Sequence, residues 1–507
     1  MMITRKTCIT FLLVFTIMFA KSQENQQILT FQDALHIMEL QNPAIKRAQK
    51  QIEQQEFELK EKRGLYLPVV SLNANAVSMS EMLHLDLTPV KDAITPLYNT
   101  LGNYGVFSGV PNPDPATNSV APFLPDNIST KVVRDKLIEG GEQIENADWD
   151  KVIQEKNFAS VSAGFVWPVF TGGKIKSANE AASVNISISQ EELKVARGTL
   201  LTELASRYYG LALGIEVLKV REQMFEDMDK HYSDAQKLFD NGIIAKVQLL
   251  NAAVARNEAE RELKQAKRNI EIIRSGLDAT LSYDSTVYVL PASKLFINRE
   301  LPNLSHWVEN AYTDNPQLKQ IEQKGELVDI KNQMDKGSYL PTIAMMGNYN
   351  IADKNLSPYI PDWLVGVGMK WTVFEGLGRK NKIKAGETMR SQVDYAEQKA
   401  QADLIAYLTK LYQELQIQME QKNELEGTLE LALEYAASTE KAFNEGLSTS
   451  TAVVEARTKV TQVKAMVLKL FYDYDVTLAT LLQISGAPAE YLQYCEGENT
   501  IAESLTN

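Results

Sequence analysis

The sequence has few of the residues that build disulfides, metal sites or catalytic centres. Its 507 residues include two cysteines. Cys8 lies in an apolar N-terminal segment, whose removal would leave Cys495 without an intrachain partner. No phosphate-binding loop, GxSxG nucleophile or clustered Cys–His site is present. The four histidines are scattered without ligand spacing: His36, His84, His231 and His306. We therefore predict no enzymatic activity, no cofactor and no metal site.

Long hydrophobic runs are absent beyond the first 22 residues. Arg5 and Lys6 precede the apolar run CITFLLVFTIMFA, and small residues follow at Ala20 and Ser22. This pattern is typical of a cleaved secretory signal peptide, which we place at 1–22. No later window is long and apolar enough for a membrane-spanning helix. The formal net charge of −13 becomes −16 without the three basic residues of this segment, and so acidic a protein is a poor partner for nucleic acid.

Proline is missing from two blocks of more than 120 residues. All 17 prolines lie within 43–168, within 291–361 or at 488. The intervening blocks are rich in Ala, Glu, Lys, Gln and Leu, which favour helix. LFDNG (238–242) and AFNEG (442–446) interrupt them 204 residues apart, because glycine accepts the left-handed conformation that ends a helix. We predict helical hairpins over 171–290 and 375–487, with first arms of about 65 residues or about 100 Å.

The returning arms of both hairpins carry apolar residues in heptad spacing. Steps of four and three connect eight residues of the first: Ala252, Arg256, Ala259, Leu263, Ala266, Ile270, Ile273 and Leu277. Five of these positions recur 204 residues later as Val460, Val463, Val467, Leu470 and Tyr474. This spacing indicates coiled-coil packing, and an amphipathic helix on a globular core is the alternative.

Short alternating runs flank each helical block. YLPVVSLNANA (66–76) returns as YLPTIAMMGNY (339–349), and the run over 161–169 returns over 365–373. Apolar side chains alternate there with small or polar ones, as in a strand between lipid and a wet lumen. A half-buried soluble sheet gives the same pattern over one strand. Four such runs and an export signal favour the membrane interpretation.

These patterns divide the chain into two similar halves. A helix over 23–65, a β-hairpin over 66–170 and a helical hairpin over 171–290 form the first half. A linker and helix over 291–338, a β-hairpin over 339–374 and a helical hairpin over 375–487 form the second, and 488–507 is a C-terminal tail. The first β-hairpin has a long loop at about 78–157, which holds seven prolines and is predicted to be irregular, with a partly helical stretch over 131–156.

Four strands cannot close a membrane barrel. Each unpaired backbone group at an open edge costs several kcal/mol in hydrocarbon, so the chain must share a barrel with copies of itself. Three copies would supply twelve strands. The predicted fold class is mainly α with a small β part: a coiled-coil barrel of long helices, with two helical hairpins per chain, joined to a four-strand contribution to a trimeric twelve-stranded transmembrane β-barrel.

The duplicated design resembles the TolC-like outer-membrane efflux proteins. The resemblance covers residues 27–488 apart from the long loop. It is carried by the two strand-to-helix passages and the two tips: FVWPVFTGGKIKSANEAA (165–182), MKWTVFEGLGRKNKIKAGE (369–387), LFDNGIIAKVQLLNAAVA (238–255) and AFNEGLSTSTAVVEARTK (442–459).

This resemblance implies a homotrimer in the outer membrane with a large periplasmic tunnel. The function it implies is a passive exit duct for a tripartite efflux pump or a type I secretion system, opened by an iris-like movement of the periplasmic tips. The implied partners are a periplasmic adaptor protein, an inner-membrane pump and outer-membrane lipid. Adaptor contacts would lie at the tips: Phe239, Gly242, Ile243, Ile244, Phe443, Gly446, Leu447 and Ser448. The passages from strand to helix would need glycine at Gly172, Gly173, Gly376 and Gly378.

The charged residues that close the tips in this family are mostly replaced here. The matching positions hold Phe443, Ser448, Ala452 and Gln248, and only Glu455 keeps an acid. Three copies would place Glu455 in a carboxylate ring at a pore constriction that attracts cations. A solvated carboxylate on the coiled coil is the alternative interpretation.

Three other classes of protein remain as alternatives. A self-contained porin would need many more strand runs in one chain. A periplasmic coiled-coil scaffold or adaptor without a pore would explain the hairpins but leave the four alternating runs unexplained. An exported enzyme would require a catalytic site that the sequence does not contain.

The Glu455 ring leads to a test by charge reversal. Glu455→Lys should lower the preference of the reconstituted channel for cations, because three lysines would replace three carboxylates at the constriction. Ion selectivity measured in planar bilayers checks this expectation. Unchanged selectivity would reject the ring.

Overall fold

The computed structural model describes residues 25–283, 287–497 and 499–502, which form two compact units. The first unit takes the described residues of 1–62, 176–336 and 375–507, and the second takes 63–175 and 337–374. The predicted signal peptide over 1–22 lies outside the described residues.

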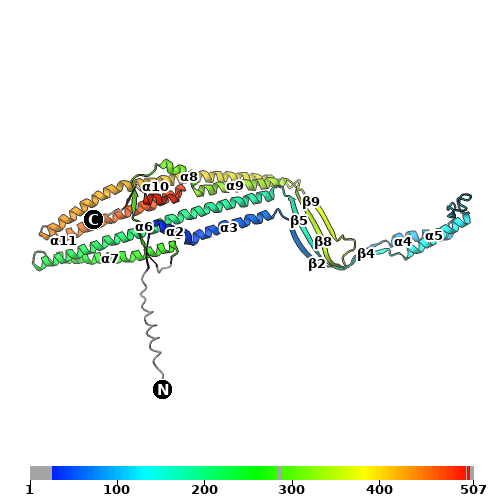
Figure 1. The fold of residues 1–507 in the computed structure, drawn as a ribbon, viewed down its shortest axis with the longest axis horizontal. Helices are drawn as coiled ribbons and strands as arrows, with labels where there is room; N and C mark the ends of the chain where they lie inside the picture. The colour runs from blue at the N-terminus through cyan, green and yellow to red at the C-terminus, as the bar shows by residue number, and fades with distance from the viewer. Residues whose placement is uncertain (1–24, 284–286, 498, 503–507) are drawn as a thin grey trace, which may run out of the picture. The chain divides into compact units, whose positions relative to one another are not determined.

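Two long helical hairpins make up most of the first unit (Figure 1). The first consists of α6 (Lys174–Asp240) and α7 (Lys246–Leu281), and the second of α10 (Gly378–Asn444) and α11 (Ser450–Ser485). Both first arms have 67 residues and both returning arms have 36. All four boundaries of the second hairpin lie 204 residues after those of the first. The predicted mainly helical fold with two hairpins is confirmed.

The heptad residues of the returning arms lie on the packed side of these helices. All five of the α11 seam are buried: Val460, Val463, Val467, Leu470 and Tyr474. In α7, Ala252, Ala259, Ile270 and Leu277 are buried, and the other four seam residues are half-buried. The coiled-coil interpretation of the spacing is therefore confirmed.

Asn-Pro occurs at 42–43 and again at 315–316, and each pair connects short helices to the end of a returning arm. Asn42 lies between α2 (Phe31–Gln41) and α3 (Pro43–Gly64), and Asn315 between α8 (Leu304–Asp314) and α9 (Pro316–Lys336). Each asparagine Oδ1 accepts a bond from a backbone N–H of the following helix, at 2.8 and 2.9 Å. Each Nδ2 donates to a backbone carbonyl near the end of a hairpin, Thr280 at 2.9 Å and Ile484 at 2.8 Å. The sequence repeat thus marks a repeated tertiary contact.

Short strands and the C-terminal segment complete the first unit. β1 (Asn25–Leu29) pairs in parallel with β6 (Val287–Pro291), and β7 (Phe296–Asn298) pairs antiparallel with β10 (Thr500–Ala502). η2 (Pro488–Glu490) and α12 (Tyr491–Glu496) precede β10. The expected single helix over 23–65 is therefore a strand and two helices, and the expected tail over 488–507 contributes to the core. The strands β1, β7 and β10 and the short helices η2 and α12 have at most six residues, so they are too short to show a hydrophobic period in the sequence.

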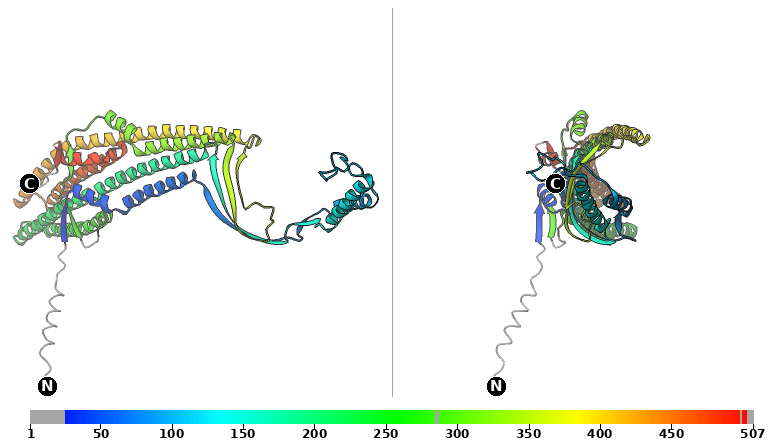
Figure 2. Two further views of the ribbon diagram at one scale, coloured as in Figure 1. Left: turned by 45° about the vertical axis from the view of Figure 1, so that its right-hand side comes forward. Right: turned by 90° about the vertical axis from the view of Figure 1, so that its right-hand side faces the viewer.

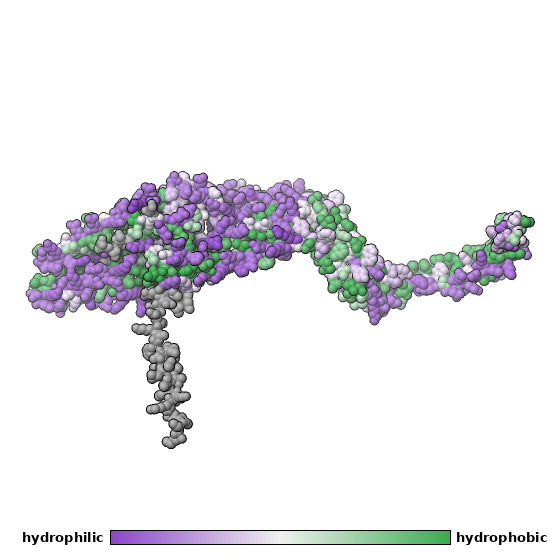
Figure 3. Space-filling model, viewed as in Figure 1, coloured by the Kyte–Doolittle hydropathy of each residue, from purple (hydrophilic) through white to green (hydrophobic). Residues whose placement is uncertain are grey.

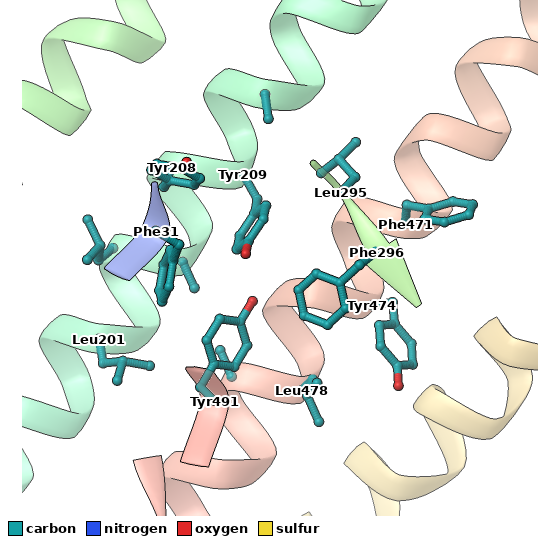
Figure 4. Packing of buried hydrophobic residues seen from close by; sticks show 14 of the residues in the cluster. Phe31, Leu201, Tyr208, Tyr209, Leu295, Phe296, Phe471, Tyr474, Leu478 and Tyr491 are labelled. Carbon is teal, nitrogen blue, oxygen red and sulfur yellow. The ribbon is translucent and has the colours of Figure 1, made fainter. Parts of the chain in front are cut away.

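An aromatic cluster fills the centre of this core (Figure 4). Phe31 stacks on Tyr209 with ring centroids 5.4 Å apart and meets Tyr208 and Tyr491 edge-on at 5.5 and 5.1 Å. Tyr208 donates from Oη to the Leu29 carbonyl at 2.7 Å. Because these residues come from α2, α6 and α12, the cluster joins both ends of the chain to the first hairpin.

The second unit contains one four-stranded antiparallel sheet (Figure 2). Its order is β2 (Val69–Ser78), β5 (Asn157–Phe170), β8 (Thr342–Lys354) and β9 (Trp363–Lys370). β9 ends before Trp371, so the alternation predicted to continue to 373 leaves the sheet at Lys370. Within the described ranges, the outer edges of β2 and β9 have no strand partner.

The strand register places apolar side chains on one face and polar ones on the other. Leu72 lies opposite Ala163, and Ala163 lies opposite Tyr349; in the same way Met345 lies opposite Val367. The other face carries Ser and Asn residues: Ser71, Asn73, Asn75, Ser160, Ser162, Asn348 and Asn350. The apolar face is solvent-exposed in one chain, with Leu72 at 73% and Val367 at 72% (Figure 3). The predicted apolar face runs across all four strands, and the opposite face is polar over its Ser and Asn rows but also carries Val69, Val166, Met346 and Leu364.

The long loop of the first β-hairpin is an ordered arm, which corrects the expected irregular structure. β3 (Leu83–Asp86) pairs with β4 (Asp150–Gln154), and α4 (Thr88–Tyr104) packs against α5 (Asp126–Asn146). Pro89 begins α4, where a missing N–H is tolerated, and Pro96 lies within that helix. The other five prolines lie in the connection between the two helices, so proline content over the whole segment concealed the hairpin. Among the described residues, no helix is both long and apolar enough to cross a membrane.

Two glycines test the tertiary contact at the end of α11. Gly486 has φ +87°, and a Cβ there would meet the Asp314 carbonyl carbon at 2.6 Å. Gly486→Ala should lower stability by about 1–3 kcal/mol. Gly427→Ala, within α10 and with nothing inside 4 Å of the new Cβ, should instead raise it by up to about 1 kcal/mol. Thermal unfolding followed by circular dichroism checks both signs, and a shift in the same direction for both variants would contradict this account.

Candidate functional site at the helical tips

Both hairpins turn through the same backbone motif. Gly242 and Gly446 have φ of +72° and +75°, the left-handed conformation that favours glycine. In the first turn the Ile243 N–H donates to the Leu238 carbonyl, and in the second the Leu447 N–H donates to the Ala442 carbonyl, both at 2.8 Å. These bonds are typical of a Schellman helix end. The turn residues that were predicted from the sequence therefore lie at the two tips of the helical hairpins.

The side chains predicted at the tips differ in exposure. Leu447 and Ile243 are 79% and 58% exposed, so each turn presents one large apolar side chain to solvent. Gly242 and Gly446 are exposed, whereas Phe239, Ile244 and Ser448 are half-buried. Phe443 is 1% exposed, although Phe239 occupies the matching place in the first repeat. Of the predicted tip residues, Ile243 and Leu447 thus lie at the surface, whereas Phe443 is buried between the helices.

Phe443 anchors a small apolar cluster that joins the two hairpins. Its buried members come from all four long helices: Ala235, Ala252, Phe443 and Val453. Tyr232, Leu238, Ile244 and Leu249 pack around it. Because the cluster includes residues of both repeats, separating the tips would expose Phe443 to water.

A buried histidine bridges the hairpins beside this cluster. His231 of α6 is 6% exposed, and its Nε2 lies 2.8 Å from Ser450 Oγ at the start of α11. The His231 ring lies 4.8 Å from the ring of Phe443. The Ser450 N–H also donates to Gln248 Oε1 at 3.4 Å. Burial lowers the pKa of His231 below the usual histidine value, while Glu440, Asp234 and Arg457 act on it through their charges.

A four-residue ion cluster adds a second bridge. Lys230 Nζ lies 2.9 Å from Glu440 Oε1, and Arg457 contacts both Glu440 and, at 3.2 Å, Asp227. Burial raises the pKa of Glu440, but hydrogen bonds from Lys230 and Arg457 outweigh it and hold that pKa below the usual value. The four residues belong to α6, α10 and α11, so ion pairs as well as apolar packing connect the tips.

Sequence reasoning missed these bridging residues. His231, Ser450 and Arg457 have Tyr435, Lys246 and Ala253 at the matching places of the other repeat. The sequence carried no local signal for these residues, because the two repeats differ at most positions of the hairpins and not only at these three. The structure leaves Glu455 exposed on α11, between buried Val453 and Ala456.

Three of the four predicted passage glycines have positive φ. These are Gly172, Gly173 and Gly376, at +62°, +83° and +61°. A Cβ on Gly172 would lie 2.4 Å from the Gly337 carbonyl oxygen, so Gly337 is a further glycine that the close approach requires. Gly378 is the first residue of α10, and nothing lies within 4 Å of a Cβ placed there. No cluster of three or more metal-ligating side chains occurs in the described part of the chain.

The His231 contact predicts that acid loosens the tips. In the unfolded chain a histidine has a pKa of about 6.5. Burial lowers the pKa of His231 in the folded protein, so the folded tip favours the neutral imidazole. The resulting stabilisation is present above about pH 6.5 and is lost as the pH falls through the folded pKa. Hydrogen exchange of amides 238–247, corrected for intrinsic rates, should be faster at about pH 5.5 than at about pH 7.5. His231→Gln, which does not titrate, should remove this difference, and an equal difference in both proteins would contradict the assignment.

The fold agrees with that of known proteins of one class. A family model described as outer membrane efflux protein matches residues 148–282 and 307–487. The probable outer membrane lipoprotein SilC of Salmonella typhimurium is 20% identical over 332 residues, covering 62% of this chain and 69% of SilC.

Solved structures share the fold at low sequence identity. The CmeC outer membrane channel of Campylobacter jejuni has a TM-score of 0.67 at 12% identity, over 90% of this chain and 86% of CmeC. The outer membrane protein VceC of Vibrio cholerae has a TM-score of 0.64 at 11% identity, over 90% of this chain and 96% of VceC. The chain belongs to the outer membrane efflux protein family.

Proposed function

We propose that three copies of this chain form an outer-membrane channel that serves as a passive exit duct for an efflux pump or a type I secretion system. One observation carries the proposal: a four-stranded sheet with an exposed apolar face, a polar opposite face and two unpaired edges in the described part of the chain. A protein of the outer membrane must pair such edges, because hydrocarbon offers them no hydrogen bonds.

Closure by identical neighbours satisfies both edges at once. The free edge of β2 in one copy pairs with the free edge of β9 in the next, and three copies close a barrel of twelve strands. The apolar face then meets lipid, and the Asn and Ser face lines a wet lumen. A periplasmic scaffold without a pore leaves the exposed apolar face of the sheet unexplained.

The long helices form the periplasmic part of the duct. With two hairpins per copy, three copies contribute twelve helices of the tunnel. Each 67-residue arm is about 100 Å long, which is the length scale of a conduit across a periplasm. The duct carries no energy source of its own, so an inner-membrane pump drives transport through it.

The tips are the proposed gate and the proposed contact for a periplasmic adaptor. Ile243 and Leu447 are the apolar side chains that each turn offers to a partner. The Phe443 cluster, the His231–Ser450 contact and the ion cluster hold the two hairpins together in this conformation. An adaptor opens the gate, by an iris-like movement of the helices, if it binds the separated tips more tightly than the joined ones. Glu455 is the candidate for the charged constriction.

The trimer and its pore are tested on the purified protein. Unheated samples should migrate as trimers in denaturing gels and convert to monomers on boiling, and planar bilayers should show discrete conductance steps. A stable single-copy particle that forms no pore would refute the proposal.

If the turns contact an adaptor, a charge introduced at a turn should reduce export more than the same charge introduced elsewhere on the hairpin. Ile243→Glu should reduce export by at least about tenfold, because burying a carboxylate against an apolar partner surface is costly. Ile272→Glu is the matched control, since Ile272 is 71% exposed on α7, almost thirty residues further along the chain. Accumulation of a fluorescent efflux substrate in cells measures export, and unheated gels verify that both variants form trimers. Equal export by both variants would argue against docking at the turn.

A further inference from the structure

The α4–α5 arm is a closely packed helix pair with glycines at its contacts. A Cβ on Gly102 would meet Ile138 Cγ1 at 2.9 Å, and one on Gly140 would meet the Tyr98 ring at 3.1 Å. Lys91 Nζ donates to the Glu145 carbonyl at 2.8 Å at one end of the pair. The arm is therefore a defined unit with its own side-chain packing.

One side of α4 remains uncovered by this packing. Val90, Leu97 and Tyr104 follow each other at steps of seven and are 46%, 57% and 80% exposed. Half-buried Ile94 and Leu101 lie between them, which completes a 4-3-4-3 spacing. Figure 3 shows apolar surface along the arm. A heptad row of this kind is typical of a helix that packs against another helix.

The charge distribution of the arm indicates which partner covers the row. α5 carries seven charged residues besides Asp126 at its start, but α4 carries only Lys91 and Asp92, and the row itself has none. Around a symmetry axis each residue meets its own copies, so any charge on the contacting row would face like charge. An uncharged row beside an acidic helix fits self-association better than capture of a charged partner.

The base of the arm is fixed to the sheet that the trimer must share. Gln154 is 8% exposed; its Nε2 donates to the Asn355 carbonyl at 2.7 Å, and its Oε1 accepts from the Ser357 N–H at 2.8 Å. These contacts attach β4 to the connection between β8 and β9. The arms of three copies therefore begin at the same rim of the barrel, which continues the proposed strand interface.

We infer that the α4 helices of three copies associate through Val90, Leu97 and Tyr104 about the symmetry axis at the outer end of the channel. This inference rests on the proposed trimer. Each copy supplies the same uncharged row, and the acidic α5 helices remain outside the contact, in water. The arm is thus a second, extramembrane interface of the assembly.

Cysteine crosslinking in the full-length protein tests the contact. Leu97→Cys introduces a thiol on the row, and Glu142→Cys introduces one on exposed α5 as a matched control. The native Cys495 gives little background, because burial raises its pKa to about 12. Under mild oxidation the L97C variant should form intermolecular disulfides at least about tenfold faster than the E142C variant, since the contact raises the local thiol concentration.

A second variant separates loss of the contact from loss of the trimer. Tyr104→Asp added to Leu97→Cys should slow crosslinking by about tenfold, because three carboxylates would meet at the axis. Unheated gels report the trimer independently. L97C trimers that crosslink no faster than E142C trimers, and whose new thiol is labelled freely by a soluble maleimide, would overturn this inference alone. Absence of trimers in the unmodified protein would overturn the proposed function, and this inference with it.

Discussion

The unpaired edges of β2 and β9 are the constraint on which the rest of the molecule depends. A sheet that faces lipid must satisfy every backbone N–H and C=O within protein, and the four strands described in one chain leave two rows unsatisfied. Only additional strands solve this problem, and identical copies supply them with the correct edge on each side. Duplication within the chain follows the same logic, because each repeat contributes one strand hairpin and one helical hairpin to the tube.

The duplication is closely kept in the backbone, whereas the side chains of the two repeats have diverged. Helix lengths of 67 and 36 residues, the turn hydrogen bonds and the Asn42 and Asn315 contacts are the same in both repeats. Side chains have diverged along the whole length of the hairpins, while the turns keep the similar sequences LFDNG and AFNEG. The two matching phenylalanines still differ in burial, because Phe443 is buried and Phe239 is half-buried. His231 of the first hairpin contacts Ser450 of the second, so these unlike side chains give the tips a specific contact.

Sequence reasoning predicted the parts whose signals repeat over many residues. Missing proline, heptad spacing and period-two alternation located the hairpins, the α7 and α11 seams and the faces of the sheet. Sequence reasoning missed the elements whose signal is short or depends on a partner far away in the chain. β1, α12 and β10 are stabilised by packing around Tyr491 and Tyr209 and by pairing with distant strands. The His231 contact spans 219 positions, and α4 was missed because Pro89 and Pro96 lie within it, whereas the helical stretch predicted over 131–156 overlaps α5. The turn glycines located the tips in the sequence, but no sequence signal located the His231–Ser450 contact or the ion cluster beside them.

Burial along the hairpins differs between the aromatic core and the tips. Near the aromatic core, ten of the sixteen residues of α11 from Val467 to Leu482 are buried, and they recur at every turn of the helix. At the tip the apolar contact between hairpins has only four buried members among the described residues, and polar bridges surround it. Polar bridges exchange readily for water, whereas a large apolar core does not. The apolar contact between the hairpins is thus smaller at the tips than at the aromatic core, which supports the proposal that the tips are the end of the duct that opens and closes.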